Sequence, residues 1–272
     1  MKAKVTVLAV ALVGAMFHSS GLPAANEAGK GDAGAPQGAP RISVAPKGHY
    51  TRLDSLPDWG GAWFLASSPG ATPPSPPKLK GPYLAAYEKW RQEVKAKSGQ
   101  VATSQSNCMP PGMPVLMGVG QYPVEFLFTP GRVTVHYEAW MQWRNIYTDG
   151  RKHPEDLDPS FQGDSIGHWE GDTLVVETVG IKKELGLTPA TRGPVPGHSA
   201  KLRILERIHL DPKDANSLVV EMTLEDPEAL VEPYKQTLAY RRDRNQELLE
   251  FVCAENDRNP VDPQGNTTFT HE

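Results

Sequence analysis

The side chains with the most chemical potential in this chain gather in one polar stretch, residues 144–178, between two strand-like segments. The stretch contains side chains that could transfer protons or bind a polar ligand: Asp149, Arg151, His153, Asp156, Asp158, Asp164, Ser165, His168, Glu170 and Asp172. A polar connection of this length is uncommon in a compact domain and is usually functional or disordered. Trp143, Trp169 and regularly spaced Gly and Pro turns argue against disorder. We therefore expect the rim of a binding or catalytic site here.

Acid-base chemistry is the reaction type that these residues suit best. His153 is held beside Pro154, and a histidine oriented by a carboxylate is the minimum for a general base. We expect Asp149 or Asp164 to provide that orientation, and the alternative is a loop whose aspartates cap turns. The predicted catalytic residues are His153, Asp149, Asp164 and His198. The side chains predicted to bind substrate or stabilise developing negative charge are Tyr147, Arg151, Ser165, His168, Trp143 and Glu206.

Two other chemistries fit the stretch less well. The histidine spacing matches no zinc signature such as HExxH, so we predict no bound metal. Gly163–Gly167 formally matches G-x-S-x-G, but that motif needs a strand, a sharp turn and then a helix, whereas a turn and a strand-like run follow here. Ser165 is therefore expected to offer hydrogen bonds at the rim. Nucleotide, dinucleotide and haem-attachment motifs are absent from the sequence, and we expect no cofactor.

Another candidate carboxylate, Glu206, lies in the strand-like run 202–210. A period of two places it on one face with Leu202, Ile204, Ile208 and Leu210. A carboxylate on an apolar face is costly unless it is paired. It is then either an acid or base with a raised pKa, or the partner of an arginine from another strand. His198 precedes Glu206 by about 26 Å of straight strand at roughly 3.3 Å per residue, so we expect it to act with His153 or Asp164 instead.

The elements that would position these residues are mainly β-strands. Turn signals separate an aromatic opening strand at 58–65 from candidate strands at 124–129, 132–140, 141–148, 172–178, 202–210, 217–225, 234–242 and 247–253. Apolar residues at helical spacing predict one helix over 83–97. We expect an antiparallel meander that forms a calycin-like barrel or a barrel-like sandwich with one flanking helix. One face of 132–140 and of 141–148 would line either a ligand cavity or a filled core.

The ends of the chain predict its organisation and its compartment. Lys2 and Lys4 precede an apolar run of signal-peptide length, and small residues follow near Ala25. We therefore predict a signal peptide, a flexible linker, a single β domain and a tail, with bounds at 1–25, 26–57, 58–262 and 263–272. The mature protein would be periplasmic or secreted, without a membrane span.

The cysteine content predicts a disulfide, and the net charge indicates which class of molecule the protein binds. Two cysteines, Cys108 and Cys253, in an exported chain predict one disulfide. The formal net charge is −4, from 28 basic and 32 acidic residues. Such a balanced charge does not favour binding to nucleic acid or to an anionic membrane, and we expect a small-molecule partner.

The motifs also carry a resemblance. The chain resembles a group of exported bacterial hypothetical proteins in which IYTDGR-x-HP precedes GxSxGxWEGDTLVV-[ED]-T, then HS and ERx; the matching residues are Ile146–Pro154, Gly163–Thr178, His198-Ser199 and Glu206-Arg207. The resemblance extends from about Trp59 to Cys253 and implies one integral domain rather than a particular activity. Gly61-Ala62-Trp63 is also similar to the lipocalin and calycin entrance strand, which is an analogy of fold alone.

Two main classes of function follow from the sequence. The first is a cofactor-independent hydrolase, lyase or isomerase that acts on a small, partly apolar organic molecule. The second is a non-catalytic periplasmic carrier of an apolar small molecule, and a structural or interaction protein of the envelope is a third. The number of ionisable groups in 149–172 favours the enzyme, because acid-base catalysis needs a positioned donor and acceptor whereas a carrier needs few.

Overall fold

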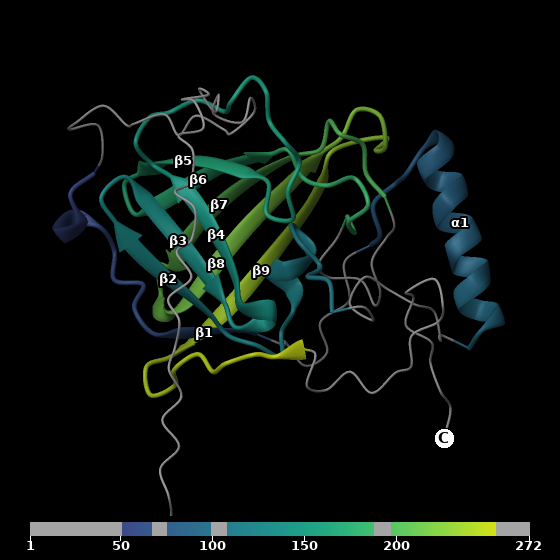
Figure 1. The fold of residues 1–272 in the computed structure, drawn as a ribbon. Coiled ribbons are helices and arrows are strands. Elements are labelled where there is room, and N and C mark those ends of the chain that lie inside the picture. The colour runs from purple at the N-terminus through teal and green to yellow at the C-terminus, as the bar shows by residue number, and fades with distance from the viewer. Residues whose placement is uncertain (1–50, 67–74, 99–107, 188–196, 254–272) are drawn as a thin grey trace, which may run out of the picture. The chain divides into compact units, whose positions relative to one another are not determined.

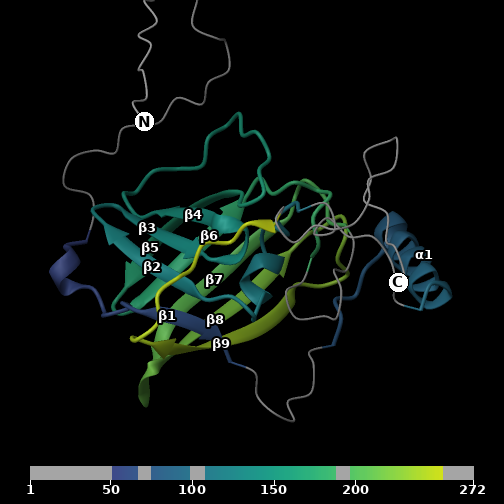
Figure 2. The same ribbon diagram turned by 60° about the horizontal axis from the view of Figure 1, so that its bottom comes forward.

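Nine strands form a closed barrel in which neighbours in space follow the order of the sequence (Figure 1). The computed structural model describes residues 51–66, 75–98, 108–187 and 197–253. Closure comes from β1, which pairs with β2 on one side and with β9 on the other (Figure 2). The strands are β1 (Ala62–Leu65), β2 (Val124–Thr129), β3 (Arg132–Tyr137), β4 (Gln142–Tyr147), β5 (Asp164–Glu170), β6 (Thr173–Val179), β7 (Arg203–Asp211), β8 (Asp214–Glu225) and β9 (Tyr234–Asp243). The predicted mainly β barrel is confirmed.

One pairing departs from the predicted antiparallel meander. β4 and β5 run parallel, with Ile146 opposite Ser165 and Tyr147 opposite Ile166, whereas every other pair of neighbouring strands is antiparallel. Parallel strands cannot be joined by a tight hairpin and need a crossover of a dozen or more residues. The unusual length of the polar connection 148–163 is therefore a consequence of the topology.

Three strand predictions differ from the structure. β5 lies within the stretch that was expected to be a rim loop, and residues 247–253 contain no strand. The predicted strand 132–140 ends early, because a short 3-10 turn, η4 (Ala139–Met141), joins β3 to β4 with Trp140 and Met141 at φ of 55° and 48°.

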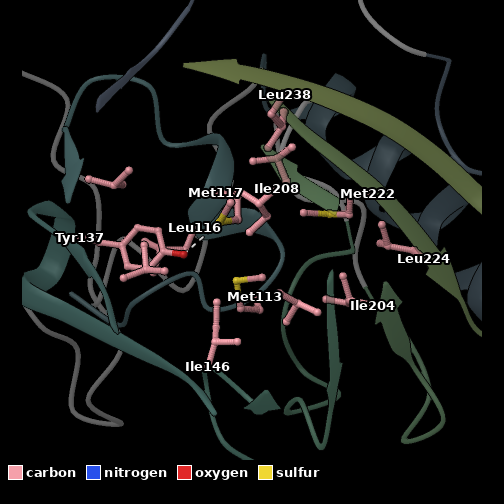
Figure 3. Packing of buried hydrophobic residues seen from close by; sticks show 14 of the residues in the cluster. Met113, Leu116, Met117, Tyr137, Ile146, Ile204, Ile208, Met222, Leu224 and Leu238 are labelled. Atoms are coloured by element: carbon pink, nitrogen blue, oxygen red, sulfur yellow. Dashed lines mark hydrogen bonds between the residues drawn. The ribbon is translucent and has the colours of Figure 1, made fainter. Parts of the chain in front are cut away.

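Side chains fill the interior of the barrel. A 3-10 turn, η3 (Val115–Gly118), brings Leu116 and Met117 into the core beside Met113, and all three are at most 2% exposed. Figure 3 shows these residues among inward side chains of the strands, with the Tyr137 hydroxyl donating to Met117 Sδ at 2.9 Å. The Tyr240 hydroxyl donates to the carbonyl oxygen of Met117. Of the two interpretations of the inward faces, a filled core is the one observed.

The helix and the disulfide agree with the sequence. α1 (Gly81–Ala96) covers most of the predicted helix, and none of its residues is fully buried. Backbone bonds tie the segment before it to the β8–β9 connection, from Lys80 N to Ala229 O and from Val231 N to Lys78 O, both at 2.9 Å. Cys108 and Cys253 form a disulfide with their Cα atoms 5.6 Å apart.

The predicted signal peptide and tail lie outside the described residues. Residues 51–57, the described part of the predicted linker, contain one 3-10 turn, η1 (Leu53–Ser55), with no buried residue. Within the described ranges, no helix has the length and apolar character to cross a lipid bilayer.

Candidate functional site

His153 and Asp164 form a hydrogen-bonded pair, called the dyad below. Nδ1 of His153 lies 2.5 Å from Oδ1 of Asp164. His153 belongs to the connection 148–163, and Asp164 is the first residue of β5, where it pairs with Val179 of β6. Gly163 sets this position with a φ of 68°, and a Cβ there would lie 2.6 Å from the Val179 carbonyl oxygen. Of the two aspartates expected to orient His153, Asp164 makes the contact.

The dyad leaves one nitrogen of His153 free to act. An ionised carboxylate can only accept hydrogen bonds, so Nδ1 of His153 donates to Asp164 and a neutral imidazole carries its lone pair on Nε2. Nε2 is buried and has no hydrogen-bond partner within the described part of the chain. The side chains of His153 and Asp164 are 19% and 18% exposed. An oriented imidazole with an unoccupied acceptor is what a general base requires.

Asp149, Arg151 and Tyr147 form a second cluster nearby. Arg151 Nε donates to Asp149 Oδ1 at 2.9 Å, and the guanidinium lies over the Tyr147 ring, 3.7 Å from its centroid. Burial alone would raise the pKa of Asp149, but hydrogen bonds from Arg151 outweigh it and hold the pKa below its ordinary value. Asp149 therefore positions Arg151 rather than His153.

A hollow of about 380 Å³, called the near hollow below, opens on the outer face of the barrel at this cluster. Its lining includes Arg151, Ile166, Val175, Glu177, Arg203 and Leu205. The hydrogen bond from Arg203 holds the pKa of Glu177 below its usual value, against the effect of burial. Neither residue of the dyad lines the near hollow, whereas His168 does, and the hollow reaches the dyad's own connection at Gly150 and Arg151. Apolar walls with a few polar groups are typical of small-molecule sites.

The other two predicted histidines lie apart from the dyad. His198 is 1% exposed, and its Nδ1 donates to the Ser199 carbonyl oxygen at 2.8 Å. Burial lowers the pKa of His198, partly offset by that hydrogen bond. None of its hydrogen bonds within the described ranges reaches the dyad, and the neighbouring Ser199 is held by Asp226. His168 is exposed and pairs with Glu170 at 3.2 Å.

Glu206 and Ser165 belong to a buried polar cluster inside the barrel. Arg144 of β4 donates to both carboxylate oxygens of Glu206, to Ser165 Oγ at 3.1 Å and to Thr178 Oγ1 at 2.7 Å. The side chains of Arg144 and Glu206 are 1% and 0% exposed. Burial opposes the charge on Arg144, but Glu206 raises its pKa. The structural ion pair, rather than a substrate-binding acid, is therefore the interpretation of Glu206 that the structure supports.

Arg144 is the residue that sequence reasoning missed. The alternation of 141–148 places it on the same face as Ile146, and the available signal was the need of Glu206, on an apolar face of 202–210, for an arginine partner. Trp143, on the opposite face, lies outside the barrel. It is 48% exposed and stacks on His136 with ring centroids 3.7 Å apart, and it does not line the near hollow.

Comparison with known proteins adds no assignment. No protein-family model matches the chain, and no curated protein matches it. Among the described residues, no group of three or more His, Cys, Asp and Glu side chains is placed to hold a metal ion.

Proposed function

We propose that this protein is an enzyme in which His153 acts as a general base on a small, partly apolar organic molecule held in the near hollow. The observation that carries the proposal is the dyad, because Asp164 fixes the imidazole while Nε2 has no partner among the described residues. The Nε2 atoms of His136 and His198 also lack a partner there, and the carboxylate on Nδ1 is what sets His153 apart from them.

The chemistry follows from the positions of the charges. Nε2 of His153 takes a proton from the substrate or from a water molecule, and Asp164 stabilises the imidazolium that forms. Arg151 stays charged, since its hydrogen bonds to Asp149 raise its pKa, and it faces negative charge that develops in the near hollow. Proton abstraction from water leads to hydrolysis, and abstraction from carbon leads to elimination or isomerisation. Because Nε2 is covered, substrate access requires a shift of the connection 148–163.

The carrier function has less support. A carrier of the calycin type holds its ligand inside the barrel, and here Met113, Leu116 and Met117 occupy that space. An exported location fits the proposal, because the Cys108–Cys253 disulfide is of a kind that persists in oxidising compartments.

The test uses a substrate whose reaction needs only a base. Removal of one proton from the carbon of a nitrobenzisoxazole breaks its N–O bond and releases a coloured phenolate. We expect the wild-type protein to accelerate this reaction and His153→Ala to reduce the rate by about 10²-fold or more, which is the usual contribution of a positioned base.

His209→Ala is the control, since it removes a partly buried histidine of β7 whose Nδ1 donates to the Leu210 carbonyl oxygen and which does not line the near hollow. Its rate should equal that of the wild-type protein. Equal rates in both variants, or unfolding of His153→Ala in a thermal melt, would contradict the catalytic assignment of His153.

A further inference from the structure

The near hollow continues into a larger one along the outer face of the barrel. This second hollow, called the far hollow below, has a volume of about 710 Å³, and its lining includes Arg207, Glu221, Thr223, Lys235 and Thr237. Val175 and Leu205 line both hollows. The two hollows therefore adjoin across these side chains, and together, called the groove below, they offer more room than a small substrate of the dyad would need.

The strands under the groove have no sheet edge with unpaired backbone N–H and C=O groups. Each of β5 to β9 pairs with a neighbour on both sides, so their N–H and C=O groups are engaged in the barrel. A peptide that binds by adding a strand needs an open sheet edge. An occupant of this groove must instead be recognised by its contacts with side chains, which favours a small molecule over an extended peptide.

The groove spans several strands. It crosses the sheet from Ile166 on β5 to Thr237 on β9, which covers four inter-strand spacings. At about 4.8 Å per spacing the path is roughly 19 Å. That length exceeds one aromatic or sugar ring and suits an extended chain of about ten to fourteen carbon atoms, at roughly 1.3 Å per carbon–carbon bond along the chain.

The walls of the groove match an amphiphile. Val175 and Leu205 are half-buried in the floor, and Thr223 and Thr237 continue it with methyl groups. Charged pairs stand on either side: Arg203 bonds Glu177 at 2.7 Å, and Arg207 bonds Glu170 at 2.8 Å. Glu221 and Lys235, which also line the far hollow, carry opposite charges, so the lining as a whole does not demand a charged ligand along its length.

We propose that the two hollows form one site for a chain-bearing amphiphile, with its polar group in the near hollow beside Arg151 and its acyl chain over Val175 and Leu205 into the far hollow. The placement of a reactive group beside Arg151 rests on the proposed function; the chain-binding groove does not. The substrate class is then an acyl compound rather than a compact polar metabolite.

The experiment measures binding of decanoate and butanoate to the folded full chain by isothermal titration calorimetry. We expect decanoate to bind more tightly by about twofold for each added methylene, because a methylene in an open groove loses about half of its water contact. Leu205→Asp places a charge on the floor and should abolish decanoate binding. Leu127→Asp is the matched control, an outward and partly exposed leucine on β2 that lies outside both hollows, and it should bind decanoate normally.

A further variant keeps the test decisive if Leu205→Asp fails to fold. Thr237→Phe fills the far hollow without adding charge, and it should remove the preference for decanoate over butanoate. Equal binding of the two acids by the wild-type protein, or an unchanged preference in Thr237→Phe, would overturn the groove. A wild-type protein that prefers decanoate but has no base-dependent turnover would refute the proposed function and leave the groove standing, whereas turnover without a preference for decanoate would refute the groove alone.

Discussion

Replacement of Glu206 by glutamine removes the negative charge that Arg144 faces inside the barrel. The guanidinium is 1% exposed and donates to both carboxylate oxygens, so the neutral amide leaves a buried, uncompensated cation and turns one acceptor into a donor. Breaking a buried pair in this way costs about 3–5 kcal/mol. For a domain of about this size each kcal/mol lowers Tm by about 2–4 °C, so we expect a fall of about 6–20 °C.

Urea denaturation followed by tryptophan fluorescence measures this loss directly. Glu170→Gln is the matched control, because Glu170 accepts from Arg207 in an exposed pair whose loss should leave the urea midpoint almost unchanged. The double variant Arg144→Met/Glu206→Leu should recover most of the stability, because the Ser165 and Thr178 hydroxyls already bond to each other at 2.8 Å. A cost below about 1 kcal/mol for Glu206→Gln would refute the reasoning, since it would mean that the guanidinium finds water or another acceptor.

Three further outcomes follow from the same geometry. Asp164→Asn should lower base-dependent turnover of the nitrobenzisoxazole by about 10²-fold with a small change in Tm, because the imidazole loses its orienting acceptor. Gly163→Ala should destabilise the fold by more than Gly150→Ala in urea denaturation, because both have positive φ but only Gly163 has atoms close to the new Cβ. Burial lowers the pKa of His198 below 6.5, so the unfolded chain takes up its proton first; stability should fall as pH drops below about 6.5, and His198→Gln should flatten that dependence in pH-dependent melts.

Many strands of the barrel can be predicted from the local alternation of apolar and polar residues. Leu218, Val220, Met222 and Leu224 mark the inward face of β8, because a strand with one buried face needs an apolar side chain at every second position. This alternation did not predict β5, for a physical reason. Its inward positions are Ser165, which accepts a hydrogen bond from Arg144, Gly167, where a Cβ would lie 3.0 Å from Ile146, and Trp169, which packs against Trp59. Only one of these three positions carries an apolar side chain, so the strand lacks a regular apolar alternation.

Composition and spacing alone determined the β class, the single disulfide and the stretch that holds the candidate base, since these depend on residue types and on short-range periodicity. The partner of each charge was decided only by the tertiary structure. The register of β5 against β6 and the crossover from β4 bring Asp164 rather than Asp149 to His153. Closure of the barrel likewise brings Arg144 to Glu206, 62 residues away. The sequence shows that a carboxylate on a buried face must be paired. Which cation or imidazole pairs with it depends on strand order and register, and these are properties of the whole sheet.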